Sequence, residues 1–198
     1  DLDVHLISTT DQWAQFAIAG PNSRAVLSKI IDKVDMSNDG FPFMACSNIT
    51  VCDGTPGRLF RISFSGELAY EVAVPVRYGD ALIREIIKAG KEFDITPYGT
   101  EALGVMRIEK GHVTGAELNG QVTAFNVNMN NMISIKKDSI GSVLSRREMM
   151  IADDQIRLVG VKTVELSDSL ASGAHFVAKG EKPTTENDQG WIASVCYS

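Results

Sequence analysis

Apolar and polar residues alternate with a two-residue period in several short segments, which is the pattern of half-buried strands. The longest example is RLFRISFSGELAYEVAVP at 58–75, which predicts a β-hairpin with arms at 59–64 and 70–74 joined by a turn at 65–67. The alternation predicts that one face of the first arm is buried, and its residues are Phe60, Ile62 and Phe64. Residues 12–19 and 43–52 are two further strand candidates.

Helices are predicted where apolar residues recur at helical spacing. A helix at 78–93 would place Ile83 and Ile86 in the core, and a helix from Thr100 to Lys110 would end at Gly111, a residue suited to a left-handed stop. Leu103 and Met106 of the second helix and Val72 of the hairpin complete the predicted core. A shorter helix is expected after Gly20-Pro21. The order strand, helix, two strands, helix predicts an α+β fold with a ferredoxin-like layer.

The last third of the chain has a weaker pattern. We predict a helix at 139–150 with Asp138 as its N-cap, and strands at 156–164 and 190–197. The chain begins at Asp1 without Met or a signal peptide, within a strand-like segment, and its last residues alternate like a strand up to Ser198. We therefore expect it to be a piece of a longer polypeptide.

Composition narrows the function classes. The 198 residues are 44% apolar and 22% charged, with a net charge of −6 and a pI near 5.1. This balance argues against a nucleic-acid partner and against a polybasic membrane patch, and no apolar run is long enough for a membrane span. We expect a cytoplasmic protein in which Cys46, Cys52 and Cys196 are free thiols. No glycine-rich nucleotide motif and no His/Cys cluster at ligand spacing occurs, so neither a nucleotide site nor a metal site is predicted.

Glu71 is the residue of greatest chemical interest because it interrupts an otherwise apolar strand. A carboxylate at such a position either faces water or is buried for a purpose, since an unpaired buried charge costs several kcal/mol. Residue type alone favours the solvated alternative. The pattern of apolar and polar residues does not decide between a solvated and a buried Glu71 carboxylate.

The string SFSGELAYEVAVP at 63–75 resembles the folate-site segment of the aminomethyltransferase (glycine-cleavage T-protein) superfamily, Y-x-G-E-x-G-x-E. The resemblance is greater to the C-terminal part of the α subunits of heterotetrameric sarcosine oxidases. It implies that Glu71 binds the pterin of tetrahydrofolate and that Phe64 and Tyr70 contribute to the cofactor site. Phe64 stands where the family has Tyr, and Ala69 where it has a second Gly.

Three other strings support the same resemblance, at 20–27, 102–112 and 136–141. The second departs from the family in two ways. Leu103 replaces an Arg that contacts folate in T-proteins, and His112 replaces the reactive Cys of the branch that supports iron–sulfur enzymes, so thiol chemistry is not available. Arg107 and Glu109 are expected to pair with other elements rather than with substrate.

The resemblance implies a T-protein folate-binding fold in three parts. These are an α+β folate-binding domain at 1–122, a connecting helical segment at 123–155 and the start of a C-terminal β-barrel at 156–198.

The implied function is the folate-binding part of a sarcosine oxidase α subunit. Tetrahydrofolate would accept the one-carbon unit from sarcosine as 5,10-methylenetetrahydrofolate, while flavin and NAD would lie on other parts of a hetero-oligomeric complex. The family's catalytic Asp would precede residue 1, so no catalytic residue is assigned in this chain. A non-catalytic folate-binding module and a purely structural half-subunit are the alternatives.

Overall fold

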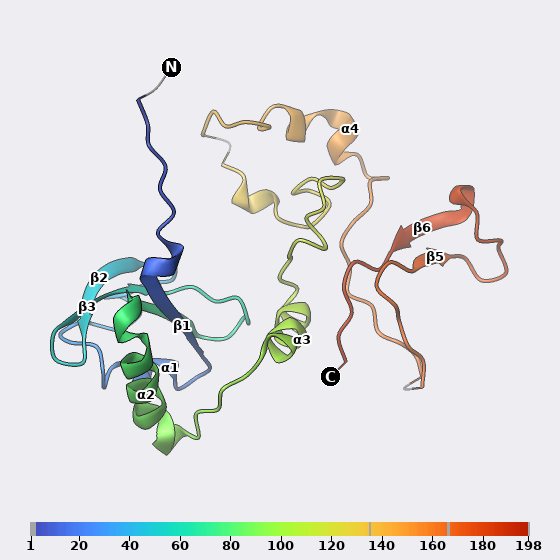
Figure 1. Ribbon diagram of the computed structural model, residues 1–198. Helices are drawn as coiled ribbons and strands as arrows, with labels where there is room; N and C mark the ends of the chain where they lie inside the picture. Colours follow the sequence, from blue (N-terminus) through green and yellow to red (C-terminus); the bar gives the residue numbers. More distant parts are fainter. Residues whose placement is uncertain (1–2, 135, 166, 198) are drawn as a thin grey trace. The chain divides into compact units, whose positions relative to one another are not determined.

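The computed structural model describes residues 3–134, 136–165 and 167–197 (Figure 1). The chain divides into two compact units, 1–106 and 107–198. Helix α3 (Thr100–Lys110) contains the boundary between them and has the bounds that the apolar spacing predicts.

A four-stranded antiparallel sheet forms the first unit. Its strands are β1 (Trp13–Ala19), β2 (Cys46–Val51), β3 (Thr55–Phe60) and β4 (Ala69–Pro75), in the spatial order β1-β4-β3-β2. β4 is therefore a central strand with β1 on one side and β3 on the other. Because β4 is paired along both edges, side chains on its two faces are held in a defined register.

The helices α1 (Ser23–Leu27) and α2 (Gly79–Gly90) pack on one face of this sheet (Figure 1). Short 3-10 turns precede β1 (Thr10–Gln12) and flank α2 (Val76–Tyr78 and Lys91–Phe93), so the predicted helix at 78–93 is confirmed in its central part. The core between helices and sheet contains buried residues from both layers: Val26, Leu27, Leu59, Tyr70, Val72, Val74, Leu82 and Ile86.

The predicted burial is right for Val72 and Ile86 but wrong on the first hairpin arm. Leu59 is fully buried opposite Val72, whereas Phe60 lies on the other face opposite Glu71 and Phe64 is 43% exposed. Strand β3 also ends at Phe60, so the two arms are joined by a longer irregular segment at 61–68 instead of a tight turn. The remaining predicted core residues, Ile62, Ile83, Leu103 and Met106, are half-buried.

The α+β class is confirmed. Strands β1 and β3 are separated in the sheet by β4. β1 and β3 are both antiparallel to β4, which lies between them, and β2 extends the sheet at the outer edge. Among the described residues no strand follows α2 in this sheet, so the layer is not a complete ferredoxin-like one.

The second unit has little regular structure. It contains the short helix α4 (Glu148–Ile151), a hairpin of β5 (His175–Val177) and β6 (Asp188–Trp191), and 3-10 turns at Asn130–Met132, Leu144–Arg146 and Thr185–Asn187. The continuous helix predicted at 139–150 and the strand predicted at 156–164 are not formed. Only 190–191 of the strand predicted at 190–197 lies in a strand, and the start of a barrel is not confirmed.

Candidate functional site

The sheet of the first unit has a second face, opposite the helices, and Glu71 lies at its centre. Along β4 the side chains alternate, so that Tyr70, Val72 and Val74 enter the core and Glu71 and Ala73 point the other way. The register brings side chains of β1 and β3 beside them on this face, which we call the outer face: Trp13, Gln15, Ala17, Arg58 and Phe60.

The Glu71 carboxylate is half-buried and has a single hydrogen-bond partner among the described residues. Gln15 Nε2 donates a hydrogen bond to Glu71 Oε2 from the neighbouring strand β1. Ala17 lies directly opposite Glu71, and its methyl group leaves room above the carboxylate. Glu71 Oε1 accepts no hydrogen bond from any described residue, which leaves this oxygen to receive donors from outside the chain.

A cation–π contact borders Glu71 on the same face. The Arg58 guanidinium carbon lies 4.0 Å from the centre of the Trp13 ring, although the two residues belong to β3 and β1. Ala73 of β4 lies between these strands in the register and is only 2% exposed. The outer face thus offers a cation two residues and an aromatic ring four residues from the Glu71 carboxylate, counted along the strands.

Tyr70 has no exposed surface, and its hydroxyl lies inside the first unit. Arg24 Nε of α1 donates a hydrogen bond of 3.1 Å to the Tyr70 hydroxyl oxygen, while Arg24 Nη2 donates to Asn38 Oδ1 at 2.7 Å. Arg61 Nη2 donates to the same Asn38 oxygen at 2.9 Å. This network ties the start of β4 to α1 and to the loop that contains Asn38, so Tyr70 fixes the strand that carries Glu71.

Phe64 lies in the irregular segment between β3 and β4, away from regular pairing. The segment is shaped by local hydrogen bonds, because the Gly66 amide donates to Ser63 Oγ at 3.0 Å and Ser65 is buried. Gly66 has φ of +87°, a conformation that other residues adopt at a cost. Sequence reasoning placed Phe64 in a strand, and the structure places it in a loop that leaves its ring accessible.

The second unit contains a buried polar cluster that the sequence reasoning found only in part. Arg107, predicted to pair with another element, makes an ion pair of 3.0 Å with Glu117. Ser194 Oγ donates to Glu117 Oε1 at 2.5 Å and accepts from Arg107 Nη2 at 2.7 Å. Thr114 and Glu117 have the T-x-x-E spacing of a capping box, and the Thr114 amide donates to the carboxylate at 2.7 Å, so this spacing was the available signal for Glu117.

The acidity of Glu117 reflects this environment. Burial raises its pKa, but the hydrogen bonds from Ser194, from the Thr114 amide and from Arg107 outweigh burial and lower the pKa to about 2. The carboxylate is therefore ionised throughout the neutral range. All the hydrogen-bond donors to the Glu117 carboxylate are protein groups. This arrangement is typical of a structural interaction and not of a catalytic acid or base.

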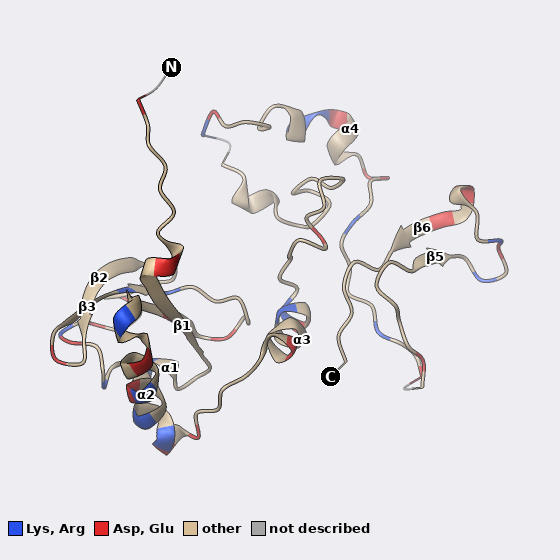
Figure 2. Ribbon diagram, viewed as in Figure 1, with Lys and Arg blue, Asp and Glu red and all other residues tan. Residues whose placement is uncertain are grey.

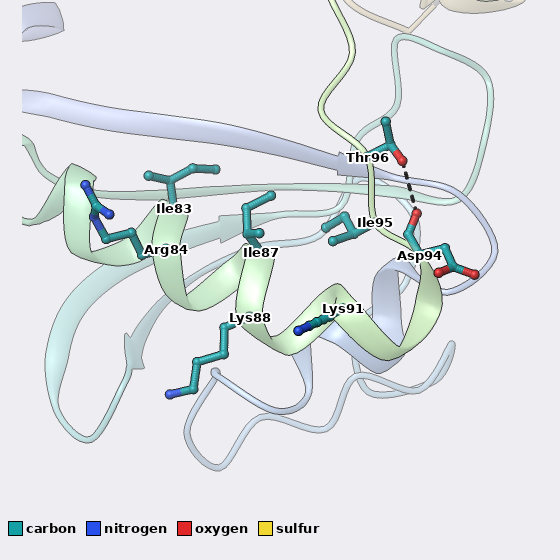
Figure 3. Close-up of a pocket in the computed structure, with 8 residues that line it drawn as sticks. All are labelled: Ile83, Arg84, Ile87, Lys88, Lys91, Asp94, Ile95 and Thr96. Carbon is teal, nitrogen blue, oxygen red and sulfur yellow. Dashed lines mark hydrogen bonds between the residues drawn. The ribbon is translucent and has the colours of Figure 1, made fainter.

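A hollow lies elsewhere, along the outer side of α2 (Figure 3). It has a volume of about 700 Å³, a floor of Ile83, Ile87 and Ile95, and Lys91 at its rim. It is shallow and contains none of Glu71, Phe64 and Tyr70. Charges of both signs follow α2 (Figure 2), and Arg84 beside the hollow is already paired with Asp80.

Comparisons with known proteins identify the family of this chain. Residues 1–137 match the GCVT N-terminal domain. The chain belongs to the GCVT N-terminal domain family. The α subunit of sarcosine oxidase from Rhizobium meliloti is 48% identical over the whole of this chain, and that from Corynebacterium sp. (strain P-1) is 41% identical over 98% of it. Rat mitochondrial dimethylglycine dehydrogenase is 32% identical over 68% of the chain.

The chain spans 20% of the length of each of the two sarcosine oxidase subunits. The part that matches the GCVT N-terminal domain family includes Glu71, Phe64, Tyr70 and every residue of the outer face. Ser194, by contrast, lies beyond the matched residues, so the buried cluster joins the GCVT N-terminal domain segment to the segment that follows it.

Among the described residues, no group of three or more His, Cys, Asp or Glu side chains could hold a metal ion. In the part of the chain that the structure describes, no helix is both long and apolar enough to cross a membrane.

Proposed function

We propose that this chain forms the tetrahydrofolate-binding part of a sarcosine oxidase α subunit. The observation that carries the proposal is the Glu71 carboxylate at the centre of the outer face. One of its oxygens is held by Gln15, and the other accepts no hydrogen bond from a described residue. Membership of the GCVT N-terminal domain family and the identity of 48% to a sarcosine oxidase α subunit support it.

The chemistry of the pterin suits such a carboxylate. A 2-amino-4-oxopterin presents N–H donors side by side along one edge, and an ionised carboxylate accepts two parallel hydrogen bonds from such an edge. Charge-assisted bonds of this kind are shorter and roughly twice as strong as neutral ones. Glu71 would thus select the ring by its donor pattern and orient it on the sheet.

Phe64 and Tyr70 would contribute in different ways. Phe64 is 43% exposed in its loop and can offer a ring face to a planar ligand. Tyr70 is fully buried and bonded to Arg24, so it would act through the position of β4 and not by touching the ligand.

Folate bound here would supply the acceptor for a one-carbon unit. The N-methyl group of sarcosine would be oxidised by a flavin on another part of the complex, and the product would be 5,10-methylenetetrahydrofolate and glycine. Within this assembly the chain's own residues hold and orient the folate. Other subunits of the oxidase would be its partners, and the flavin and NAD sites would lie outside this chain.

Calorimetric titration of the natural full-length protein with a stable reduced folate, 5-formyltetrahydrofolate, tests the proposal. Glu71→Gln keeps the size of the side chain but turns an acceptor into a donor, so one N–H of the pterin loses its partner. We expect affinity to fall by about 30- to 1000-fold, equivalent to ~2–4 kcal/mol. Glu67→Gln is the control, because Glu67 is exposed in the loop before β4. Equal affinities of wild type and Glu71→Gln would refute the assignment.

A second measurement separates the alternatives. If the chain is a non-catalytic folate-binding module, folate binds but oxidation of sarcosine yields free formaldehyde whether folate is present or absent. If the chain is only structural, no folate binds at all. Production of 5,10-methylenetetrahydrofolate at the expense of formaldehyde is the result that the proposal requires.

A further inference from the structure

Gln15 lies on the sheet where its side-chain amide can hold the Glu71 carboxylate in one orientation. In the β1–β4 pairing Gln15 lies opposite Ala73 and Glu71 lies opposite Ala17, so the two long side chains are diagonal neighbours on the outer face. Diagonal neighbours on one face of a sheet are within reach of each other when their side chains are long. The small residues Ala17 and Ala73 fill the other two corners, and the Gln15 amide reaches the carboxylate without competition.

The direction of this contact follows from the chemistry of the two groups. An ionised carboxylate only accepts hydrogen bonds, so the Gln15 amide must turn its nitrogen towards Glu71. That bond engages Oε2 and restricts rotation about the last torsion of Glu71, which is otherwise a broad, two-fold rotation. Oε1 is then presented in one orientation, with no other described donor against it.

We propose that Gln15 is a positioning residue for ligand recognition by Glu71. It holds the carboxylate so that its open oxygen faces a ligand edge with adjacent N–H donors, and it does so without touching the ligand. The inference rests on the proposed function, because the ligand class is the 2-amino-4-oxopterin edge for which Glu71 is proposed. Neither the match to the GCVT N-terminal domain family nor the resemblance at 63–75 points to Gln15.

The first test is a double-mutant cycle on the natural full-length protein, titrated with 5-formyltetrahydrofolate. Gln15→Ala removes the amide and should weaken binding about 10-fold, which is the effect of one hydrogen bond to a charged group. Glu71→Ala removes the carboxylate. If Gln15 acts only through Glu71, Gln15→Ala should cause no further loss in the Glu71→Ala protein, because residues that act as a unit are not additive. Additive losses would show that Gln15 contacts the ligand directly and would overturn the positioning role.

The second test uses charge repulsion. Gln15→Glu has nearly the same shape but replaces the amide donor with a second carboxylate against Glu71, and like charges in contact repel each other. Affinity for 5-formyltetrahydrofolate should be at least about 10-fold below wild type.

Asn48→Asp is the matched control, since Asn48 is an exposed amide on the outer face of β2 that does not contact Glu71. It adds the same charge to the same face and should leave the affinity unchanged. An equal loss of affinity in Asn48→Asp would show a general charge effect and overturn the proposal.

The outcomes separate this inference from the proposed function. If wild type binds folate and Glu71→Gln weakens binding but Gln15→Ala and Gln15→Glu do not, the proposed function stands and the role of Gln15 is refuted. If wild type binds no folate, both are refuted. Unchanged far-ultraviolet circular dichroism of the variants checks that a loss of affinity is not a loss of fold.

Discussion

Arg107 and Glu117 form a buried ion pair in which Arg107 Nη1 lies 3.0 Å from Glu117 Oε2 and the two side chains are 11% and 5% exposed. Ser194, more than seventy residues further along the chain, bridges them by accepting from Arg107 and donating to Glu117. A buried charge pair stabilises a protein only if its remaining donors and acceptors are satisfied. Here Thr114 supplies the missing donors through its amide and its hydroxyl.

The depressed pKa of Glu117 predicts a pH dependence of stability. Its pKa falls from 4.5 to about 2 on folding, so the stabilisation is fully present above pH 4.5 and is lost as pH falls through 2. The corresponding free energy is about 3 kcal/mol. Calorimetric unfolding of wild type and Glu117→Gln should differ at pH 6 and converge near pH 2.

The control for this prediction is Glu109→Gln, an exposed carboxylate on α3, the helix that also carries Arg107. Its unfolding temperature should follow that of wild type at every pH. A constant difference between wild type and Glu117→Gln from pH 6 to pH 2 would contradict the assignment of the ionised carboxylate as the stabilising form.

The choice of buried face on β3 leads to a stability prediction. Leu59 is 0% exposed and lies opposite Val72 in the core, whereas Phe60 is half-buried on the outer face. Leu59→Ala should destabilise the first unit by about 2–5 kcal/mol, because the cavity adds to the lost burial. Phe60→Ala, although it removes more atoms, should cost less. Hydrogen–deuterium exchange of peptides from β3 and β4 measures both, and the reverse ranking would place Phe60 in the core instead.

The success of sequence reasoning followed the strength of the local signals. β1 has a strand-like alternation and is followed by Gly20-Pro21, and α3 has a helical apolar spacing and a glycine stop, so both were predictable. The buried face of β3 could not be predicted from the sequence, because Leu59 and Phe60 are both apolar and the alternation does not show which of them enters the core. Pairing with β4 decides this, and pairing is a long-range property.

In the second unit, the apolar pattern did not predict the regular elements correctly. A helix at 139–150 and a strand at 156–164 were predicted, but within these ranges Ile140, Val143 and Val164 are 107%, 73% and 94% exposed. An amphipathic pattern forms a stable element only when its apolar face packs against something. The Gln15–Glu71 contact was likewise hidden from the sequence, because it joins strands separated by more than fifty residues.

Two glycines in helices should respond oppositely to the same substitution. A Cβ at Gly79, the first residue of α2, would lie 2.6 Å from the Ala14 Cβ of β1, whereas one at Gly104 in α3 would meet nothing within 4 Å. Gly79→Ala should destabilise the first unit by about 1–3 kcal/mol through overpacking. Gly104→Ala should stabilise α3 by about 0.5–1 kcal/mol through helix propensity. Hydrogen–deuterium exchange would show faster exchange in α2 and slower exchange in α3, and stabilisation by both substitutions would contradict the close contact of α2 with β1.

The contact of Arg58 with Trp13 should hold three strands together. The guanidinium lies 4.0 Å from the ring centre and the contact crosses β4 at Ala73, which is only 2% exposed. Arg58→Ala should remove about 0.5–1 kcal/mol of cation–π stabilisation and open Ala73 to water. Faster hydrogen exchange is expected in peptides of β1, β3 and β4 together. Arg77→Ala is the matched control, because Arg77 lies 4.6 Å from the ring of its own neighbour Tyr78 and joins no strands. Its loss should leave the sheet amides unchanged, and equal acceleration in the two variants would show that the Arg58 contact does not tie the strands.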